Sequence, residues 1–313
     1  MKQLEFHAMG SRMLAILDSS SAASEQALQF VPDRFEAWEQ SLSRFRLDSE
    51  LSFLNRSEGH PVPVSDTLWE VFHTAREAEQ YTGGLVRPTV LDALMQAGYD
   101  RSFDRLPAFG NSSATGLLEL PDLATAITCD ESTRSLCLPE GVHLDFGGVA
   151  KGWAAMKAVQ MLGFYGPALV DAGGDIAVSG PRLDGQSWPI GVRDPFQSEG
   201  YFETLLIKRG GVATSGTDYH RWQQGGTWNH HIIDPRTGLS ADTDLLTVTV
   251  VAPDTVRAEA AAKAVLILGS SAGMDWLESD PTLAGILILQ SGETIYSHPM
   301  QSYLWRENDP LTE

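Results

Sequence analysis

The 313-residue sequence contains little cysteine, few basic residues and no long apolar run. Its two cysteines, Cys129 and Cys137, are too few for a disulfide scaffold. Acidic residues outnumber basic ones 41 to 22, and the net charge of -19 argues against a broad face for nucleic acid or anionic membranes. No stretch reaches the roughly 18 uninterrupted apolar residues that a membrane-spanning helix needs.

The first residues, MKQLEFHAMGSRM, contain no apolar segment of the kind found in secretion signals. We therefore expect a cytoplasmic protein whose partners include neither nucleic acid nor a membrane. Hydrophobic residues make up 42% of the chain and charged residues 20%, which is typical of a globular protein and excludes a disordered or fibrous one.

The pattern of apolar and polar residues predicts an α+β fold in one domain over residues 1–313. Helices are expected at 21–47, where Pro32 marks a bend or a restart, at 65–81 after the N-cap Ser65, from after Gly152 to about Gly163, and at 255–268 before the C-cap Gly269. Strands are expected at 4–17, 126–129, 135–138, 168–171, 175–179, 189–192, 204–207, 211–213, 231–233, 246–251, 284–290 and 293–296. Because strands and helices do not alternate regularly, the helices should group against largely antiparallel sheets. Residues 101–122 are expected to form an inserted surface loop, and 305–313 a loose tail.

Five segments combine glycine with polar residues, as happens where the backbone approaches a ligand. They are Met9–Ser11, Asp145–Gly152, Asp171–Asp175, Thr214–Gly216 and His230–Gly238. The GGVAKG stretch runs into a helix and would direct backbone N–H groups and a lysine at an anion such as a phosphate. The alternative is that each glycine pair only forms a tight turn or a bulge. Neither a Walker loop nor a GxGxxG fingerprint is present.

His231 is the best candidate for proton transfer, because imidazole titrates near neutrality and Asp234 lies close in sequence. The alternative is a surface histidine that is hydrogen-bonded to the turn marked by Pro235 and Gly238. His230 should point to the opposite face of the same strand. The two cysteines are expected to be small buried residues of a hairpin.

Taken in order, these segments resemble the ApbE-type FAD:protein FMN transferases. The resemblance rests on HAMGSRM, LSRFRLDSELSFLN, GGLVRPTV, LDFGGVAKGW, DAGGDIAVSG, ATSGTDY, HHIIDPRTG and TVVAPDTVRAEAAAKAVLILG, and runs from residue 6 to about 270. It implies an α+β fold related to the T-fold, an extended FAD pocket and the use of Mg²⁺. It also implies transfer of the FMN half of FAD to a serine or threonine hydroxyl of an acceptor flavoprotein, with release of AMP.

The resemblance assigns roles by motif position. His231 would be the catalytic base or a substrate-orienting group, and the metal ligands would be the carbonyl of Gly148 and the Glu259 carboxylate. The residues that would bind FAD are Met9, Gly10, Asn55, Arg87, Asp145, Gly147, Lys151, Gly174, Asp175, Ser215, Gly216, Ile232 and Asp234.

The sequence departs from the family at charged positions. Glu259 and Lys263 stand where the family carries an Asp and, four residues later, a Thr that serve the metal. Glutamate can still ligate a hard cation, but lysine has no acceptor. Arg87 and Met156 replace acidic residues, so we expect weaker cation affinity. Our hypothesis is that the Lys263 ammonium lies about where the metal would; the alternative is an exposed helix pair with Glu259.

Three classes of function therefore stay open at this stage. The protein could be a flavin transferase with an altered cation site, a relative that binds FAD or another nucleotide with little or no transfer, or a structural protein that kept only the fold. The retained Asp145, Lys151, Asp175, Ser215 and His231 favour the first two. Release of AMP would distinguish a transferase from a binding protein.

Overall fold

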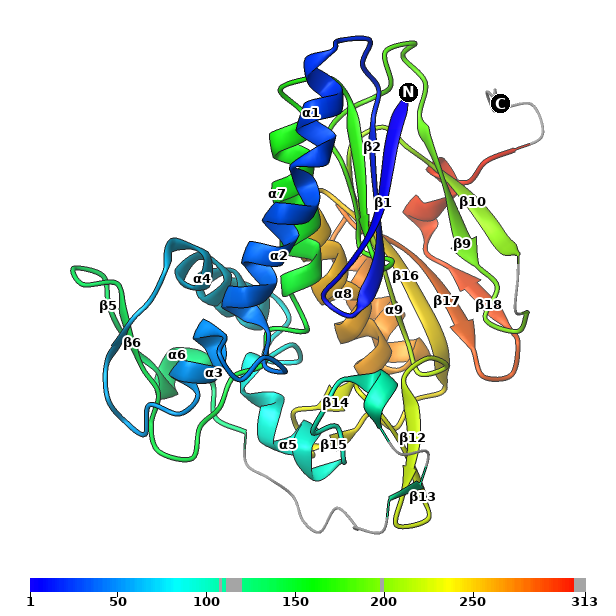
Figure 1. Cartoon of the computed structure of the whole chain (residues 1–313). Coiled ribbons are helices and arrows are strands. Elements are labelled where there is room, and N and C mark those ends of the chain that lie inside the picture. The colour runs from blue at the N-terminus through cyan, green and yellow to red at the C-terminus, as the bar shows by residue number, and fades with distance from the viewer. Residues whose placement is uncertain (107–108, 111–119, 198–199, 307–313) are drawn as a thin grey trace. The chain divides into compact units, whose positions relative to one another are not determined.

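The computed structural model describes residues 1–106, 109–110, 120–197 and 200–306 (Figure 1). The chain divides into two compact units. Unit 1 comprises Met1–Phe35, Lys151–Gly216 and Asp244–Glu313, and unit 2 comprises Glu36–Ala150 and Thr217–Thr243. In the described part of the chain, no helix is long and apolar enough to cross a membrane.

Unit 1 is built on an eight-stranded sheet of order β1-β2-β7-β8-β11-β16-β17-β18. Its strands are β1 (Lys2–Ala8), β2 (Ser11–Leu17), β7 (Ala168–Ala172), β8 (Ile176–Val178), β11 (Gly210–Gly216), β16 (Leu245–Ala252), β17 (Ala284–Leu289) and β18 (Thr294–Tyr296). Each neighbouring pair is antiparallel. A hairpin of β9 (Trp188–Arg193) and β10 (Tyr201–Ile207) shares a hydrophobic core with the sheet, in which Trp188, Ile207 and Val251 are buried.

Helices complete unit 1. They are α1 (Ala23–Gln29), the start of α2 (Val31–Leu42), α7 (Ala150–Leu162), α8 (Thr255–Leu268), α9 (Ser270–Glu278) and the 3-10 helix η3 (His298–Ser302). Helix α8 packs on β11 and β16, and α9 packs on β17 (Figure 1). The approach of α8 is close, because a Cβ at Gly211 would lie 2.3 Å from the Cα of Thr255. The Asp254 side chain caps α8 by accepting from the Arg257 N–H at 2.8 Å.

Unit 2 contains shorter elements. Its helices are the rest of α2, α3 (Glu50–Leu54), α4 (Asp66–Tyr81), η1 (Pro88–Val90), α5 (Leu91–Gln96), η2 (Phe103–Arg105) and α6 (Leu123–Ala126). Its strands are β3 (Val62–Pro63), β4 (Phe109–Gly110), β5 (Thr128–Asp130), β6 (Ser135–Cys137), β12 (Arg221–Gln224), β13 (Thr227–His230), β14 (Ile233–Asp234) and β15 (Leu239–Ser240). One of its cores joins Trp222 and Ile233 to Leu94, and the Trp222 indole donates to the Ala97 carbonyl at 2.5 Å.

The α+β class with largely antiparallel strands is confirmed. The helix over 65–81 is α4, and its predicted cap forms, because the Ser65 hydroxyl accepts from the Leu68 N–H at 3.2 Å. The hairpin around 130–134 is also present, as β5 paired with β6. The prediction of a single domain over 1–313 stays a prediction.

Several boundaries were wrong. The expected strand at 4–17 is a hairpin that turns at Met9 and Gly10. The restart expected near Pro32 is confirmed, because α1 ends at Gln29 and α2 begins at Val31, but the helix expected to run to residue 47 ends at Leu42. Apolar periodicity alone does not register the two-residue turn of the hairpin, and this accounts for the error in the strand. Helix α9 was not predicted. Of the expected loop and tail, residues 107–108, 111–119 and 307–313 lie outside the described residues.

The hairpin cysteines and the strand at 231–233 also need correction. Cys129 and Cys137 are partly buried free thiols rather than fully buried core residues. The short β5–β6 hairpin presents one side to solvent, so small residues there stay partly accessible. His231 lies between β13 and β14 rather than in a strand, so strand alternation does not determine where its side chain points.

Candidate functional site

Two tight turns mark one end of the sheet of unit 1. Met9 and Gly10 join β1 to β2 with φ of 48° and 69°. Gly173 and Gly174 join β7 to β8 with φ of 69° and 97°, in the left-handed region that glycine adopts without strain. A Cβ at Gly173 would lie 2.7 Å from the Cβ of Ser11, so the two turns lie close together. Met9 holds its left-handed conformation without being glycine, which costs about 1–2 kcal/mol.

Strand β11 extends to the same end of the sheet. Its pairing with β8 ends at Val212 opposite Ile176, and the strand runs on past the Gly173–Gly174 turn to Ser215 and Gly216. Ser215 is buried. Met9, Gly10, Gly174, Asp175, Ser215 and Gly216, which the resemblance assigns to FAD, therefore gather at one end of five neighbouring strands.

Four charged side chains of unit 1 form a cluster near these turns. Lys151 of α7 contacts the Asp175 carboxylate, and its ammonium lies 4.0 Å from Oε1 of Glu259. The Lys263 ammonium, one turn further along α8, donates to the same Oε1 at 2.9 Å. The side chains of Asp175 and Glu259 are 3% and 1% exposed. Two carboxylates thus meet two ammonium groups in a place that excludes most water.

These charges set one another's pKa. Burial alone would raise the pKa of Glu259, but the ammonium groups of Lys263 and Lys151 outweigh burial and lower it. Burial alone would lower the pKa of Lys151, but the carboxylates of Asp175 and Glu259 outweigh burial and raise it. Burial and then the charge of Glu259 raise the pKa of Asp175 to about 6. Glu259 is therefore the firmest negative charge of the cluster.

The residues around Glu259 do not fit a divalent cation. Oε1 of Glu259 accepts from the Lys263 ammonium, and Oε2 accepts from the backbone N–H of Gly152 at 3.0 Å. The described residues contain no group of three or more His, Cys, Asp or Glu side chains that could hold a metal ion. Two ammonium groups beside the carboxylate would also repel Mg²⁺. The alternative prediction, that Glu259 and Lys263 form an exposed pair on the helix surface, is wrong. The Lys263 side chain is only 15% exposed, and Glu259 is buried.

In unit 2, Asp145 opens the loop that leads into α7. Its carboxylate contacts the guanidinium of Arg44 and accepts from the Gly147 N–H at 2.5 Å. The Asn55 amide holds the preceding residue at two points, donating to the Leu144 carbonyl at 2.9 Å and accepting from the Leu144 N–H at 2.8 Å. Asn55 and Arg44 therefore position the loop, and the Gly148 carbonyl belongs to the turn that follows.

The histidine segment of unit 2 has two different members. His230 is part-buried, its Nε2 lies 3.0 Å from the Ala241 carbonyl, and its Nδ1 accepts from the Ile232 N–H at 3.3 Å. Burial lowers the pKa of His230. The His231 ring packs edge-to-face on His220, with the ring centres 5.2 Å apart. His220 in turn lies 4.7 Å from the ring of the exposed Tyr219.

Asp234 has a role that its position in the sequence did not predict. Its carboxylate is buried and binds the Arg236 side chain, with Nη2 to Oδ2 at 2.7 Å and Nε to Oδ1 at 2.9 Å. Its backbone carbonyl accepts from the N–H groups of Thr237 and Gly238. Asp234 thus stabilises the turn between β14 and β15, and the expected partnership with His231 stays a prediction.

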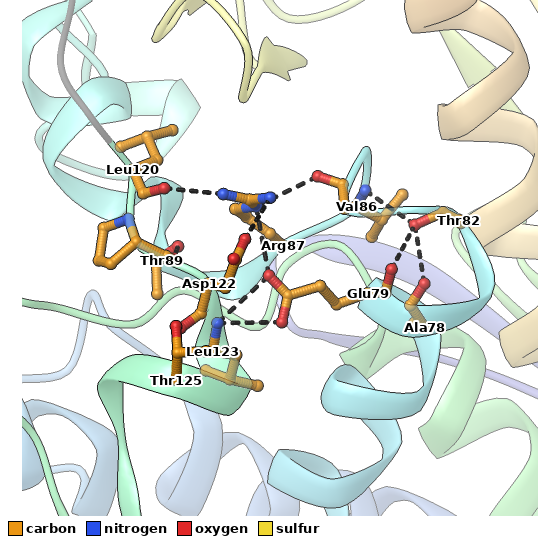
Figure 2. A network of polar contacts seen from close by, with 12 residues as sticks. Ala78, Glu79, Thr82, Val86, Arg87, Thr89, Leu120, Asp122, Leu123 and Thr125 are labelled. Atoms are coloured by element: carbon orange, nitrogen blue, oxygen red, sulfur yellow. Dashed lines mark hydrogen bonds and ion pairs between the residues drawn. The ribbon is translucent and has the colours of Figure 1, made fainter.

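Arg87 lies at the centre of a polar network in unit 2 (Figure 2). Its guanidinium donates to the carbonyls of Gly84 and Leu120 at 3.1 and 2.7 Å. It also pairs with Asp122 at 2.6 Å and with the buried Glu79 at 3.2 Å. Burial raises the pKa of Glu79, although the positive charge of Arg87 acts to lower it. The network joins the end of α4 to the start of α6, and a role of Arg87 toward FAD stays a prediction.

Two kinds of contributor are absent from the sequence-based predictions. Arg44 contacts Asp145 across about a hundred residues of chain, and no local pattern indicates such a pair. Tyr219 ends the ATSGTDY motif, and His220 is the next residue. The motif indicated a site in this part of the chain, but nothing in it indicated that His220 packs on His231 and Tyr219 on His220.

Comparison with known proteins gives one family. The ApbE family model matches residues 9–287. A relative from Treponema pallidum, named FAD:protein FMN transferase, is 30% identical over 284 residues, which are 86% of this chain and 78% of that protein. A relative of the same name from Klebsiella pneumoniae is 27% identical over 301 residues, covering 94% of this chain and 90% of that protein. The crystal structure of an ApbE protein from Thermotoga maritima matches with a TM-score of 0.83 at 23% identity, covering 97% and 99% of the two chains, and so shares the fold.

Proposed function

Since the chain belongs to the ApbE family, we propose that it is an FAD:protein FMN transferase. The observation that carries this proposal is the family match over residues 9–287, supported by relatives of that name across most of the chain. The Lys151–Asp175–Glu259–Lys263 cluster, with the glycine turns beside it, further supports a site for a charged ligand.

In the proposed reaction, a serine or threonine hydroxyl of an acceptor protein attacks the phosphorus of the FMN half of FAD. A new O–P bond forms, and the bond from that phosphorus to the bridging oxygen breaks. AMP leaves with the bridging oxygen, and the hydroxyl proton passes to a base. Attack on a diphosphate is slow in water because its negative charge repels the nucleophile, so the protein has to supply positive charge and orientation.

We assign the proton transfer to His231. A neutral imidazole near pH 7 can accept the hydroxyl proton, and the edge-to-face contact with His220 limits the orientations of the His231 ring. His231 could serve equally by orienting the acceptor hydroxyl, and these two roles differ in their effect on the pH profile of the rate.

For FAD itself, we propose the residues at the end of the sheet of unit 1. Lys151 contacts Asp175 beside the Gly173–Gly174 turn, and its side chain is 28% exposed, so it can reach a ligand while it keeps its carboxylate partners. The Gly174 N–H already donates to Oδ1 of Asp171 at 2.7 Å, so the additional backbone donors that we propose for the phosphates are those of Gly10 and Gly216. Asn55 and Asp145 would act by holding the loop in place.

The test is an assay of AMP release from FAD with a peptide that contains serine or threonine, with mass spectrometry of the peptide for the FMN adduct. The variant His231→Gln should lose about 10²-fold or more in rate while FAD binding is retained. His7→Gln, on the exposed face of β1, is the matched control. Equal rates for His231→Gln and the unaltered protein would exclude His231 as the base.

The same assay tests the alternative that this protein is a relative that binds FAD but does not transfer FMN. That alternative expects a yellow protein that binds FAD and releases no AMP with any acceptor. The cytoplasmic location and the serine or threonine acceptor stay predictions from the sequence and the resemblance.

A further inference from the structure

The buried carboxylate of Glu259 is already neutralised by this chain's own side chains. Lys263 donates to Oε1 at 2.9 Å, Lys151 lies 4.0 Å from the same oxygen, and the Gly152 N–H donates to Oε2 at 3.0 Å. A divalent cation at this carboxylate would have to displace an ammonium group that is itself only 15% exposed.

The charge of the cluster leads to the same conclusion. Asp175 and Glu259 contribute two negative charges, and Lys151 and Lys263 contribute two positive charges, so the cluster is neutral as it stands. Adding a dication would leave two uncompensated positive charges where little water can screen them.

We propose that this chain binds FAD without a divalent cation, because the Lys263 ammonium takes the place that a metal ion would hold at Glu259. The proposal rests on the proposed function for the identity of the ligand. It differs from the sequence-based hypothesis in its grounds, which are the burial of the pair and the two occupied oxygens of Glu259.

The first measurement is calorimetry on the full chain, with Mg²⁺ alone, Mn²⁺ alone, and FAD in the presence of either Mg²⁺ or EDTA. The proposal expects no heat of Mg²⁺ or Mn²⁺ binding, and a Kd for FAD that is the same within about twofold in Mg²⁺ and in EDTA. Binding of either ion to the unaltered protein at submillimolar concentration would overturn the proposal, and so would FAD binding that EDTA abolishes.

The second measurement uses variants. Glu259→Asp with Lys263→Thr removes the ammonium and leaves a carboxylate and a hydroxyl one turn apart on α8, both of which suit a hard cation. Mg²⁺ should then tighten FAD binding by at least about tenfold. Lys157→Thr is the matched control, because Lys157 lies on α7 over the ring of Trp153 and outside the cluster. An FAD Kd that ignores Mg²⁺ in the double variant would contradict the proposal.

A charge-neutral double variant keeps the test decisive if the first double variant does not fold. Glu259→Gln with Lys263→Met removes both charges together, so no unpaired charge is buried. It should fold, and its FAD binding should again ignore Mg²⁺; Mg²⁺ dependence in this variant would place the metal elsewhere and overturn the proposal.

The outcomes for metal and for transfer are separable. FAD binding that requires Mg²⁺, together with release of AMP, would overturn the metal-independent proposal and leave the transferase function standing. Metal-independent FAD binding with no AMP from any acceptor would leave this proposal standing and overturn the transferase function.

Discussion

Gly152 and Glu259 lie in direct contact between α7 and α8. The Gly152 N–H donates to Oε2 of Glu259 at 3.0 Å, and a Cβ at position 152 would come within 2.8 Å of the same oxygen and 3.0 Å of the Thr255 carbonyl. The glycine therefore allows the two helices to approach closely enough for a backbone N–H to bind the buried carboxylate.

The first prediction concerns this contact. Gly152→Ala should lower the free energy of unfolding by about 1–3 kcal/mol, because the Thr255 carbonyl is backbone and cannot give way easily. Urea denaturation measures the change. Gly180→Ala is the matched control, since its Cβ would meet only the Arg209 side chain at 3.7 Å. If the two variants unfold at the same urea concentration as the unaltered protein, the tight contact is not real.

The second prediction concerns the buried ion pair. Lys263→Met should lower the free energy of unfolding by about 3–5 kcal/mol, because it leaves the Glu259 charge without its nearest ammonium. Adding Glu259→Gln should restore most of that loss, and a double-mutant cycle by urea denaturation gives the coupling energy. Lys157→Met, which removes only a cation–π contact, should change stability by about 1 kcal/mol or less. Additive effects of the Lys263 and Glu259 changes would contradict the pairing.

The third prediction concerns the contribution of His230 to the pH dependence of protein stability. Burial lowers the folded-state pKa below the 6.5 of the free side chain, so the unfolded chain binds the proton first as the pH falls. Stability should therefore fall with pH from about 6.5 downward, until the folded state also binds the proton. Protonation would also turn Nδ1 from an acceptor into a donor facing the Ile232 N–H.

Urea denaturation of His230→Gln between pH 5 and pH 8 measures this effect. The variant should lose part of the decline below pH 6.5, whereas His7→Gln, an exposed control, should keep it. An unchanged slope in His230→Gln would show that the buried imidazole does not contribute to the pH dependence.

The fourth prediction concerns the Arg87 network of Figure 2. Arg87→Met should destabilise the protein by about 3 kcal/mol, because the buried Glu79 loses its cation and the Leu120 carbonyl loses its donor. Arg87→Lys should restore little, since one ammonium cannot reach acceptors that lie on different sides of a planar guanidinium.

Thermal unfolding of both variants is the readout for Arg87. Arg12→Met is the control, because Arg12 forms an exposed pair with Glu5. Its loss should lower the free energy of unfolding by about 0.5 kcal/mol or less. Full recovery by Arg87→Lys would mean that charge alone, and not the guanidinium geometry, holds the network.

The sequence predicted those helices whose ends are marked by their own capping residues. Ser65 before an amphipathic stripe predicted α4 and its cap, and Gly269 after an apolar run predicted the end of α8, where its φ is 81°. Met9–Gly10 was read as a ligand segment, but the left-handed turn that it forms depends on the pairing of β1 with β2. Only Gly269 separates α8 from α9, and no second helix was predicted after that glycine.

The sequence by itself determined the family, the α+β class and the identity of the charged residues, because motif order and hydrophobic periodicity are properties of the chain. It also placed Glu259 and Lys263 one helical turn apart. Only the tertiary structure decided that this pair is buried, that Lys151 and Gly152 reach the same carboxylate, and that Arg44 and Asn55 hold the Asp145 loop. These contacts join residues distant in the chain, and their strength depends on the exclusion of water, which packing alone creates.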